Sequence, residues 1–210
     1  MNFIRLVAIG LVAVVLAGCG INNVPTYQEN MKAKWSQVQN EYQRRADLIP
    51  NLVETVKGYA QQEKDVLTAV VEARAKATSV QLPADITSDP EAFKKWQDAQ
   101  GALTGALGRL LVVTENYPDL KSNQNFLALQ SQLEGTENRI AVARRDYIDA
   151  VQLYNTELQT IPGRWWAYWF YPSAKEAPTF TVDDTLKNPP KVEFNTQKPA
   201  STTTGSGSGN

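Results

Sequence analysis

Apolar side chains recur every three or four residues through most of the chain, and this spacing constrains the fold more than any other feature. Residues three and four apart lie on one face of an α-helix, so the pattern predicts long helices that each have one apolar face. Three such stretches cover residues 27–79, about 90–116 and about 120–161. We therefore expect an all-α protein in which long helices pack along these faces. In the first stretch the spacing is carried by Met31, Trp35, Val38, Tyr42, Ile49, Leu52, Val56, Tyr59, Val66, Val70, Ala73 and Ala77.

Proline marks where these helices kink, begin or end. Pro50 lacks a backbone donor and falls inside the first stretch, so the helix should kink or restart there. The apolar spacing keeps its phase across Pro50, which favours a kink over a hairpin. Ser88 or Asp89, followed by Pro90, predicts the start of the second helix, and Pro162-Gly163 predicts the end of the third.

Three glycines, Gly101, Gly105 and Gly108, interrupt the second helical stretch. Each lowers the helix propensity by up to about 1 kcal/mol relative to alanine. We expect a neighbouring helix to approach closely at these positions and to compensate for this cost.

The predicted helices differ in length. The second spans about 27 residues, whereas the first exceeds about 50 and the third reaches about 42, so at about 1.5 Å per residue both longer helices extend beyond the second. Even if the first folds back at Pro50 to supply a fourth helix, part of the third should project. This projecting apolar face is a candidate contact surface. Its residues are Tyr147, Val151, Tyr154 and Leu158.

Four charged residues fall at positions that the spacing directs into the core: Arg45, Glu63, Glu137 and Arg144. Arg45 and Glu63 are about 27 Å apart along one helix, so their partners must come from other helices. One interpretation is a buried ion-pair network that fixes the register of the helices. A second is a polar cleft that binds a ligand or performs acid/base chemistry. In a third interpretation, the four side chains lie at the edge of the apolar face and reach water.

Six aromatic residues follow Pro162 within seven positions: Trp165, Trp166, Tyr168, Trp169, Phe170 and Tyr171. They belong to a segment, residues 163–194, that we expect to be a proline-containing strap after the helices. The rings could cover one end of the bundle, insert at a membrane interface, or contact a protein partner. Arg164 before the rings and Lys175 after them suit all three interpretations. Residues 195–210 are rich in Ser, Thr and Gly and predict a disordered tail.

The N-terminus has the pattern of a secretory signal peptide. A positively charged start is followed by an apolar run of residues 6–17 and by small residues, and the run is too short to cross a bilayer comfortably. Its ending, Leu16-Ala17-Gly18-Cys19, resembles the bacterial lipobox, in which the cysteine becomes acylated and is the new N-terminus. The alternative is an uncleaved membrane anchor with an incidental cysteine. On the lipobox interpretation residues 1–18 are the signal peptide, residues 19–26 are a lipid-anchored tether, and Gly20 favours the outer over the inner membrane.

The composition argues against catalysis and nucleic-acid binding. The chain has no histidine and a single cysteine, Cys19, which removes the usual general base, the common metal ligand and any internal disulfide. Beyond residue 18 there are 20 basic and 22 acidic side chains, because only Arg5 is lost from the total of 21 basic residues, so a nucleic-acid partner is not expected. No phosphate-binding or dinucleotide-binding motif is present, and we expect no cofactor and no metal.

Several blocks in the same order resemble one known family. They are Arg44-Arg45-Ala46-Asp47-Leu48-Ile49-Pro50-Asn51-Leu52-Val53, Val56-Lys57-Gly58-Tyr59-Ala60 with Glu63, Gly108-Arg109-Leu110-Leu111, Glu115-Asn116-Tyr117-Pro118-Asp119-Leu120-Lys121, and Leu133-Glu134-Gly135-Thr136-Glu137-Asn138-Arg139-Ile140. These blocks look like the LemA family, over roughly residues 27–162. The resemblance implies an antiparallel up-and-down bundle of four helices, bacterial and held at a membrane, with no catalytic residue to carry over. It also implies that the first long helix is divided near Pro50 more deeply than its spacing indicates.

Two positions depart from the family pattern. Family members usually keep an N-terminal membrane helix, whereas this chain has the lipobox, so its bundle should face the periplasm. Gln62 stands where the family often has histidine, so no role proposed for that histidine applies here.

Two functional hypotheses follow. The first is a membrane-anchored, non-enzymatic scaffold or interaction module of the bacterial envelope, with an envelope protein or a second copy of the chain as its partner. The second is a periplasmic ligand-binding protein or hydrolase that uses a polar cleft between the helices. Charged side chains that neutralise one another in a closed core favour the first, and carboxylates that face an open pocket favour the second.

Overall fold

Four long helices and three short ones make up the described part of the chain. The computed structural model describes residues 20–80 and 86–180, and within these ranges it contains helices and no strand. This confirms the all-α prediction. The long helices are α2 (Asn23–Lys57), α3 (Lys64–Ser79), α4 (Pro90–Thr114) and α6 (Gln124–Gln159), and the short ones are the 3₁₀ turn η1 (Ile86–Ser88), α5 (Pro118–Lys121) and α7 (Gly163–Phe170).

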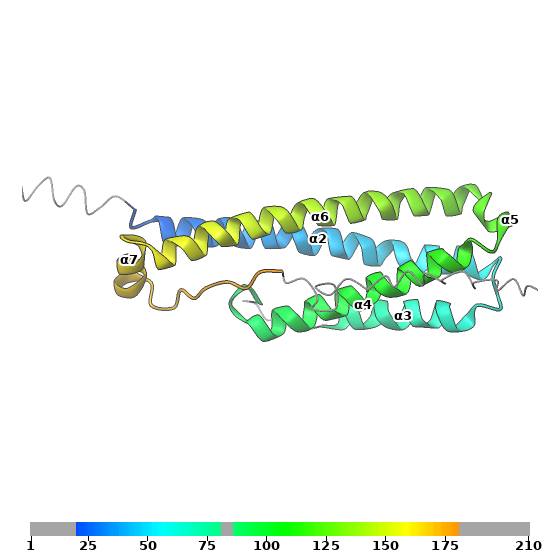
Figure 1. Ribbon diagram of the computed structural model, residues 1–210, viewed down its shortest axis with the longest axis horizontal. Helices are drawn as coiled ribbons and strands as arrows, with labels where there is room; N and C mark the ends of the chain where they lie inside the picture. The colour runs from blue at the N-terminus through cyan, green and yellow to red at the C-terminus, as the bar shows by residue number, and fades with distance from the viewer. Residues whose placement is uncertain (1–19, 81–85, 181–210) are drawn as a thin grey trace, which may run out of the picture. The chain divides into compact units, whose positions relative to one another are not determined.

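The long helices form an antiparallel bundle. Helices α2 and α6 run side by side over most of their lengths, α3 packs antiparallel against α4, and α3 also contacts α2 (Figure 1). The direction of the chain reverses at each connection, so the four helices form the antiparallel up-and-down arrangement that the family resemblance implies. The predicted signal peptide, Cys19, residues 181–194 of the strap and the predicted tail lie outside the described residues.

The first helical stretch breaks at residues 58–63, so the predicted restart at Pro50 and the deep division there that the family resemblance implies are wrong, whereas the predicted kink at Pro50 stays a prediction. Pro50 is exposed inside α2, and the helix continues to Lys57 with Gly58 as its C-cap. A proline at position 50 leaves the carbonyl of Ala46 without its helical donor. The Arg74 side chain of α3 supplies the missing bond, because its Nε donates to this carbonyl at 2.8 Å. Glycine, with its low helix propensity, instead ends the helix two turns later.

The predicted start of the second helix is confirmed. The Asp89 carboxylate accepts hydrogen bonds from the backbone N–H groups of Glu91 and Ala92, and Pro90 occupies the first turn of α4. The third helix begins slightly later than predicted, because α5 forms a separate turn before it. Asn123 then caps α6 by accepting from the N–H of Phe126.

The expected close approach at the three glycines of α4 is wrong. An ideal Cβ at Gly101, Gly105 or Gly108 would meet no atom of the described residues within 4 Å. All three lie on the exposed face of α4, so no neighbouring helix compensates for their low helix propensity.

The apolar interior consists of two clusters along the bundle. One lies between the α2–α3 turn and the middle of the bundle and includes Ile49, Val70, Leu110 and Leu133. The other lies toward the start of α2 and includes Trp35, Phe93, Trp96 and Tyr147, whose rings contact one another and Phe180.

The predicted projecting face is buried instead. Tyr147, Val151 and Tyr154 are at most 1% exposed, and Leu158 is partly buried. The reason is that α2 is long enough to accompany α6 along this region, while residues after α7 return to cover it. The backbone carbonyl of Pro178, for example, accepts from the Tyr147 hydroxyl at 3.0 Å. This face is therefore core and not a contact surface.

Candidate functional site: a buried arginine and an exposed aromatic helix

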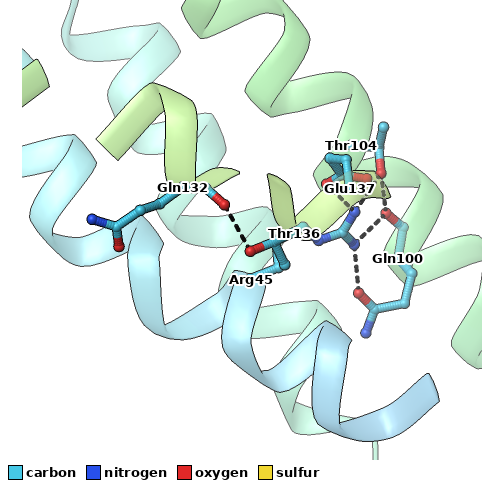
Figure 2. A network of polar contacts seen from close by, with 6 residues as sticks. All are labelled: Arg45, Gln100, Thr104, Gln132, Thr136 and Glu137. Atoms are coloured by element: carbon cyan, nitrogen blue, oxygen red, sulfur yellow. Dashed lines mark hydrogen bonds and ion pairs between the residues drawn. The ribbon is translucent and has the colours of Figure 1, made fainter. Parts of the chain in front are cut away.

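Arg45 lies at the centre of the bundle and is 1% exposed. Its Nη1 donates to Thr104 Oγ1 of α4 at 2.9 Å and to Glu137 Oε1 of α6 at 3.0 Å. Its Nη2 donates to the side-chain oxygen of Gln100 at 2.8 Å and to the backbone carbonyl of Gln100 at 3.3 Å. Figure 2 shows the guanidinium of Arg45, which extends from α2, between these groups. We call Arg45, Gln100, Thr104 and Glu137 the arginine layer.

The arginine layer connects all four long helices. Gln100 also donates from Nε2 to the carbonyl of Ala77 in α3 at 3.3 Å, so the contacts of one buried cation extend from α2 to α3, α4 and α6. Beside the layer, Thr136 donates to the carbonyl of Gln132 within α6 (Figure 2). A sheared or rotated helix would break several of these bonds together, so the layer fixes the register of the bundle.

The arginine layer separates the two apolar clusters. Along α2, Tyr42 belongs to one cluster and Ile49 to the other, and Arg45 falls between them. In α6, Glu137 falls in the same way between Leu133 and Ile140. The side chain of Glu137 is 40% exposed, whereas that of Arg45 is 1% exposed. The cation is therefore buried and neutralised by a carboxylate that still reaches water.

Glu63 and Arg144 do not join the arginine layer, so the four predicted residues do not form one network. Glu63 lies in the turn before α3, where its carboxylate accepts from the Tyr117 hydroxyl at 2.8 Å. This hydrogen bond, with a smaller effect of burial, raises the pKa of Tyr117. Glu63 thus ties the α2–α3 turn to the corner between α4 and α5.

Arg144 lies further along α6, against the ring of Phe180. Its guanidinium is 4.3 Å from the centre of the Phe180 ring. Burial raises the pKa of Tyr42, and the positive charges of Arg144 and Arg45 partly offset that rise. Arg144 therefore holds the segment after α7 against the bundle.

Sequence reasoning missed Gln100 and Arg74. Gln100 occupies a core-facing position of α4, four residues after Trp96 and three before Leu103, so the same spacing that revealed Arg45 contains its signal. Arg74 has no such signal, because its role depends on a carbonyl of another helix.

Two carboxylates line a groove on the described surface, and both are paired with cations. A groove of about 470 Å³ between α2 and α6 contains Glu41 and Asp146, but Glu41 pairs with Arg139 at 3.1 Å and Asp146 with Lys34 at 3.1 Å. Neither Glu63 nor Glu137 lines this groove, a second groove between α2, α3 and α4, or a third between α2 and α3. Within residues 20–80 and 86–180, no three Asp, Glu, Cys or His side chains are grouped to hold a metal ion.

The six aromatic residues form helix α7 and its C-cap, and most of their rings are exposed. Tyr168 is 79% exposed, Trp169 64%, Phe170 56% and Trp165 50%. Only Trp166 and Tyr171 are partly buried. The interpretation in which the aromatic run covers the end of the bundle therefore accounts for two of the six rings.

The family is identified by a match that covers most of the chain. A model of the LemA family matches residues 34–194. The chain belongs to the LemA family. Two relatives from Paramagnetospirillum magneticum, magnetosome proteins MamQ 1 and MamQ 2, are each 28% identical over 163 residues, which cover 70% of this chain and 60% of theirs. Protein LemA of Metamycoplasma hominis is 23% identical over 139 residues, covering 66% of this chain and 59% of its own.

The LemA match includes the arginine layer and α7 but not the lipobox. Arg45, Gln100, Glu137 and the aromatic run all lie within residues 34–194, whereas Cys19 precedes them. The chain spans about 60% of the length of the MamQ relatives it matches. Across the described residues of this LemA-family chain, no helix is both long and apolar enough to cross a bilayer.

Proposed function

We propose that this LemA-family protein is a membrane-anchored helical module of the bacterial cell envelope that presents its surface to other proteins and catalyses no reaction. Its anchor is a set of acyl chains on Cys19. The bundle faces the periplasm, at the outer rather than the inner membrane. The partner is another envelope protein or a second copy of the chain.

The arginine layer is the observation that carries the non-enzymatic part of this proposal. An acid/base site needs a carboxylate that faces a substrate cavity with a shifted affinity for protons. In this protein the two carboxylates at core-facing positions are both engaged, because Glu137 accepts from Arg45 and Glu63 accepts from Tyr117. The interior polar groups therefore serve to hold the helices in register, which suits a rigid module.

The anchoring part is supported by the sequence before α2. Residues 1–19 combine a charged start, a short apolar run and the Leu-Ala-Gly-Cys ending. Two or more acyl chains hold a protein firmly at a membrane, since each buried methylene contributes about 0.8 kcal/mol. The names of the MamQ relatives, which are magnetosome proteins, support a role in an assembled cellular structure.

The test is to express wild-type protein and the Cys19→Ala variant in a bacterium, label the cells with a fatty-acid probe, and fractionate the membranes. We expect the wild type to take up the probe and sediment with membranes, and the variant to lose the label. Chemical cross-linking and recovery of both forms from membranes then compares their partners. A partner that requires Cys19 supports the proposal. A Cys19→Ala variant that keeps the fatty-acid label would overturn the lipid anchor.

A further inference from the structure

The outward face of α7 is aromatic. At about 100° per residue, Trp165, Tyr168 and Trp169 lie within one third of the helix circumference. These residues are 50%, 79% and 64% exposed. Phe170, which is 56% exposed, flanks them. Contiguous exposed rings of this kind mark a contact surface, because single-domain proteins rarely leave such patches bare.

The opposite face of α7 is fixed to the bundle. Ala167 and Tyr171 pack against the apolar cluster at this end. At Gly163, an ideal Cβ would lie 2.2 Å from the backbone carbonyl oxygen of Glu157. Only glycine allows this close approach of α7 to the last turns of α6. The exposed rings are therefore held on a rigid support and not on a loose strap.

Helix α7 also lies beside the residue that follows the lipidation site. An ideal Cβ at Gly20 would be 3.9 Å from Trp166 Nε1 and 3.9 Å from Pro162 Cγ. Cys19 is the next residue toward the N-terminus, and consecutive Cα atoms are about 3.8 Å apart. The residue that would carry the acyl chains is therefore bonded directly to a residue that lies beside α7.

Exposed cations flank the aromatic face of α7 and suit the phosphates of lipid headgroups. Arg164 and Lys175 are exposed, and residues 158–175 contain no Asp or Glu. The nearest carboxylates, Glu157 and Glu176, accept hydrogen bonds from Asn23 and Gln159. Trp and Tyr are the residues that favour the interface between the apolar and the hydrated layers of a membrane. Aromatic rings, flanking cations and an adjacent acyl anchor together fit one occupant, a phospholipid surface, better than a protein.

We propose that α7 lies in the headgroup layer of the membrane that holds the anchor, with Trp165, Tyr168 and Trp169 inserted among the lipids. This inference rests on the proposed acylation of Cys19. It assigns α7 a second role: the acyl chains hold the protein at the membrane, and α7 sets the orientation of the bundle on it.

The experiment uses the acylated full-length protein in vesicles of phosphatidylethanolamine and phosphatidylglycerol, with or without lipids brominated near the headgroup. Bromine quenches tryptophan fluorescence only on close contact. The chain has five tryptophans, of which Trp35 and Trp96 are 5% and 3% exposed in the core. We expect brominated lipid to lower the total emission by up to about two fifths, the share of Trp165 and Trp169 if all five emit equally.

Two variants test whether the quenching comes from the tryptophans of α7. In the first, Trp165→Ser, Tyr168→Ser and Trp169→Ser are combined, and the quenched fraction should disappear while circular dichroism shows an intact bundle. The matched control combines Val112→Ser, Leu127→Ser and Val142→Ser, which change exposed apolar residues away from α7, and should be quenched like the wild type.

The outcomes separate the two proposals. If the wild type floats with the vesicles but brominated lipid does not quench it, or if the α7 variant is quenched as strongly as the wild type, the inference about α7 is overturned and the lipid anchor stands. If the wild-type protein is not acylated and does not float, the proposed function itself is overturned.

Discussion

Removing the negative charge of Glu137 tests the role assigned to the arginine layer. Glu137→Gln keeps the shape of the side chain and an oxygen that can accept from Arg45, so the main loss is the charge. Arg45 would remain as a buried cation whose partners, Gln100, Thr104 and the introduced amide, are all neutral. A buried charge without a counter-charge is costly, because water can no longer solvate it.

The expected cost follows from the geometry of the pair. Two unit charges about 4 Å apart attract by about 4 kcal/mol at an effective dielectric constant near 20. The Arg45–Glu137 contact is 3.0 Å, but the Glu137 side chain is 40% exposed, so solvent screens much of this attraction. We therefore expect Glu137→Gln to lower the free energy of unfolding by about 1–2 kcal/mol, which for a chain of this size lowers the Tm by about 3–6 °C.

Urea and thermal unfolding followed by circular dichroism measure the effect. The matched control is Glu134→Gln, an exposed glutamate in the same helix that bonds only to Gln130 among the contacts of the described residues, with an expected change below about 0.5 kcal/mol. In an Arg45→Met background, Glu137→Gln should cost almost nothing, because no buried cation is left. Equal effects of Glu137→Gln and Glu134→Gln, or an undiminished effect in the Arg45→Met background, would refute the reasoning.

Three further predictions concern the proline inside α2, the attachment of α7 and the response to alkaline pH. Arg74→Ala should lower the free energy of unfolding by about 1–2 kcal/mol in the wild type. In a Pro50→Ala background the loss should be smaller, because the new backbone N–H of residue 50 can bond to the Ala46 carbonyl. Equal losses in the two backgrounds, measured by urea unfolding, would contradict this prediction. Gly163→Ala should lower the Tm and expose α7 to proteolysis, because its Cβ meets a backbone oxygen at 2.2 Å, whereas Gly105→Ala, with open space around it, should raise stability by up to about 1 kcal/mol. Burial raises the pKa of Tyr147 above its ordinary 10.0, so the folded state favours the neutral phenol and the protein loses stability as the pH rises past 10. In urea unfolding up to about pH 11, the free energy of unfolding should fall less steeply for Tyr147→Phe than for the wild type. Equal falls would show that Tyr147 does not cause the pH dependence.

The periodicity of apolar residues was sufficient to predict the helices and most of the core. Helix propensity and capping follow local rules, so the start of α4 at Asp89 and Pro90 was predictable from the residues around it. The continuation of α2 through Pro50 was not predictable from nearby residues, because Arg74, 24 positions later in the chain, supplies the donor that the proline removes. Rules that consider only neighbouring residues in the sequence cannot predict such a contact between two helices.

The candidate site was predictable only in part, and for the same reason. Arg45 and Glu137 stood out as charges at core-facing positions, and they meet at 3.0 Å. Glu63 and Arg144 satisfied the same rule, yet one lies in a turn and the other beside Phe180. Periodicity tells which face of a helix a residue occupies, but it does not tell how the helices are aligned along their length. The burial of Tyr154 shows the same limit, since it depends on how far α2 extends beside α6.

The orientation of the bundle on the membrane tests the whole account most directly. In the acylated protein, a spin label is attached at Trp169→Cys on α7 or at Ser122→Cys in the turn just before α6. Its accessibility to oxygen and to a water-soluble nickel complex is then measured in vesicles. Because α6 is 36 residues long, its two ends lie about 50 Å apart along its axis. We predict that the label at position 169 reports the membrane interface and that the label at position 122 reports open water. Labels that both report open water, or both report the membrane, would contradict the account.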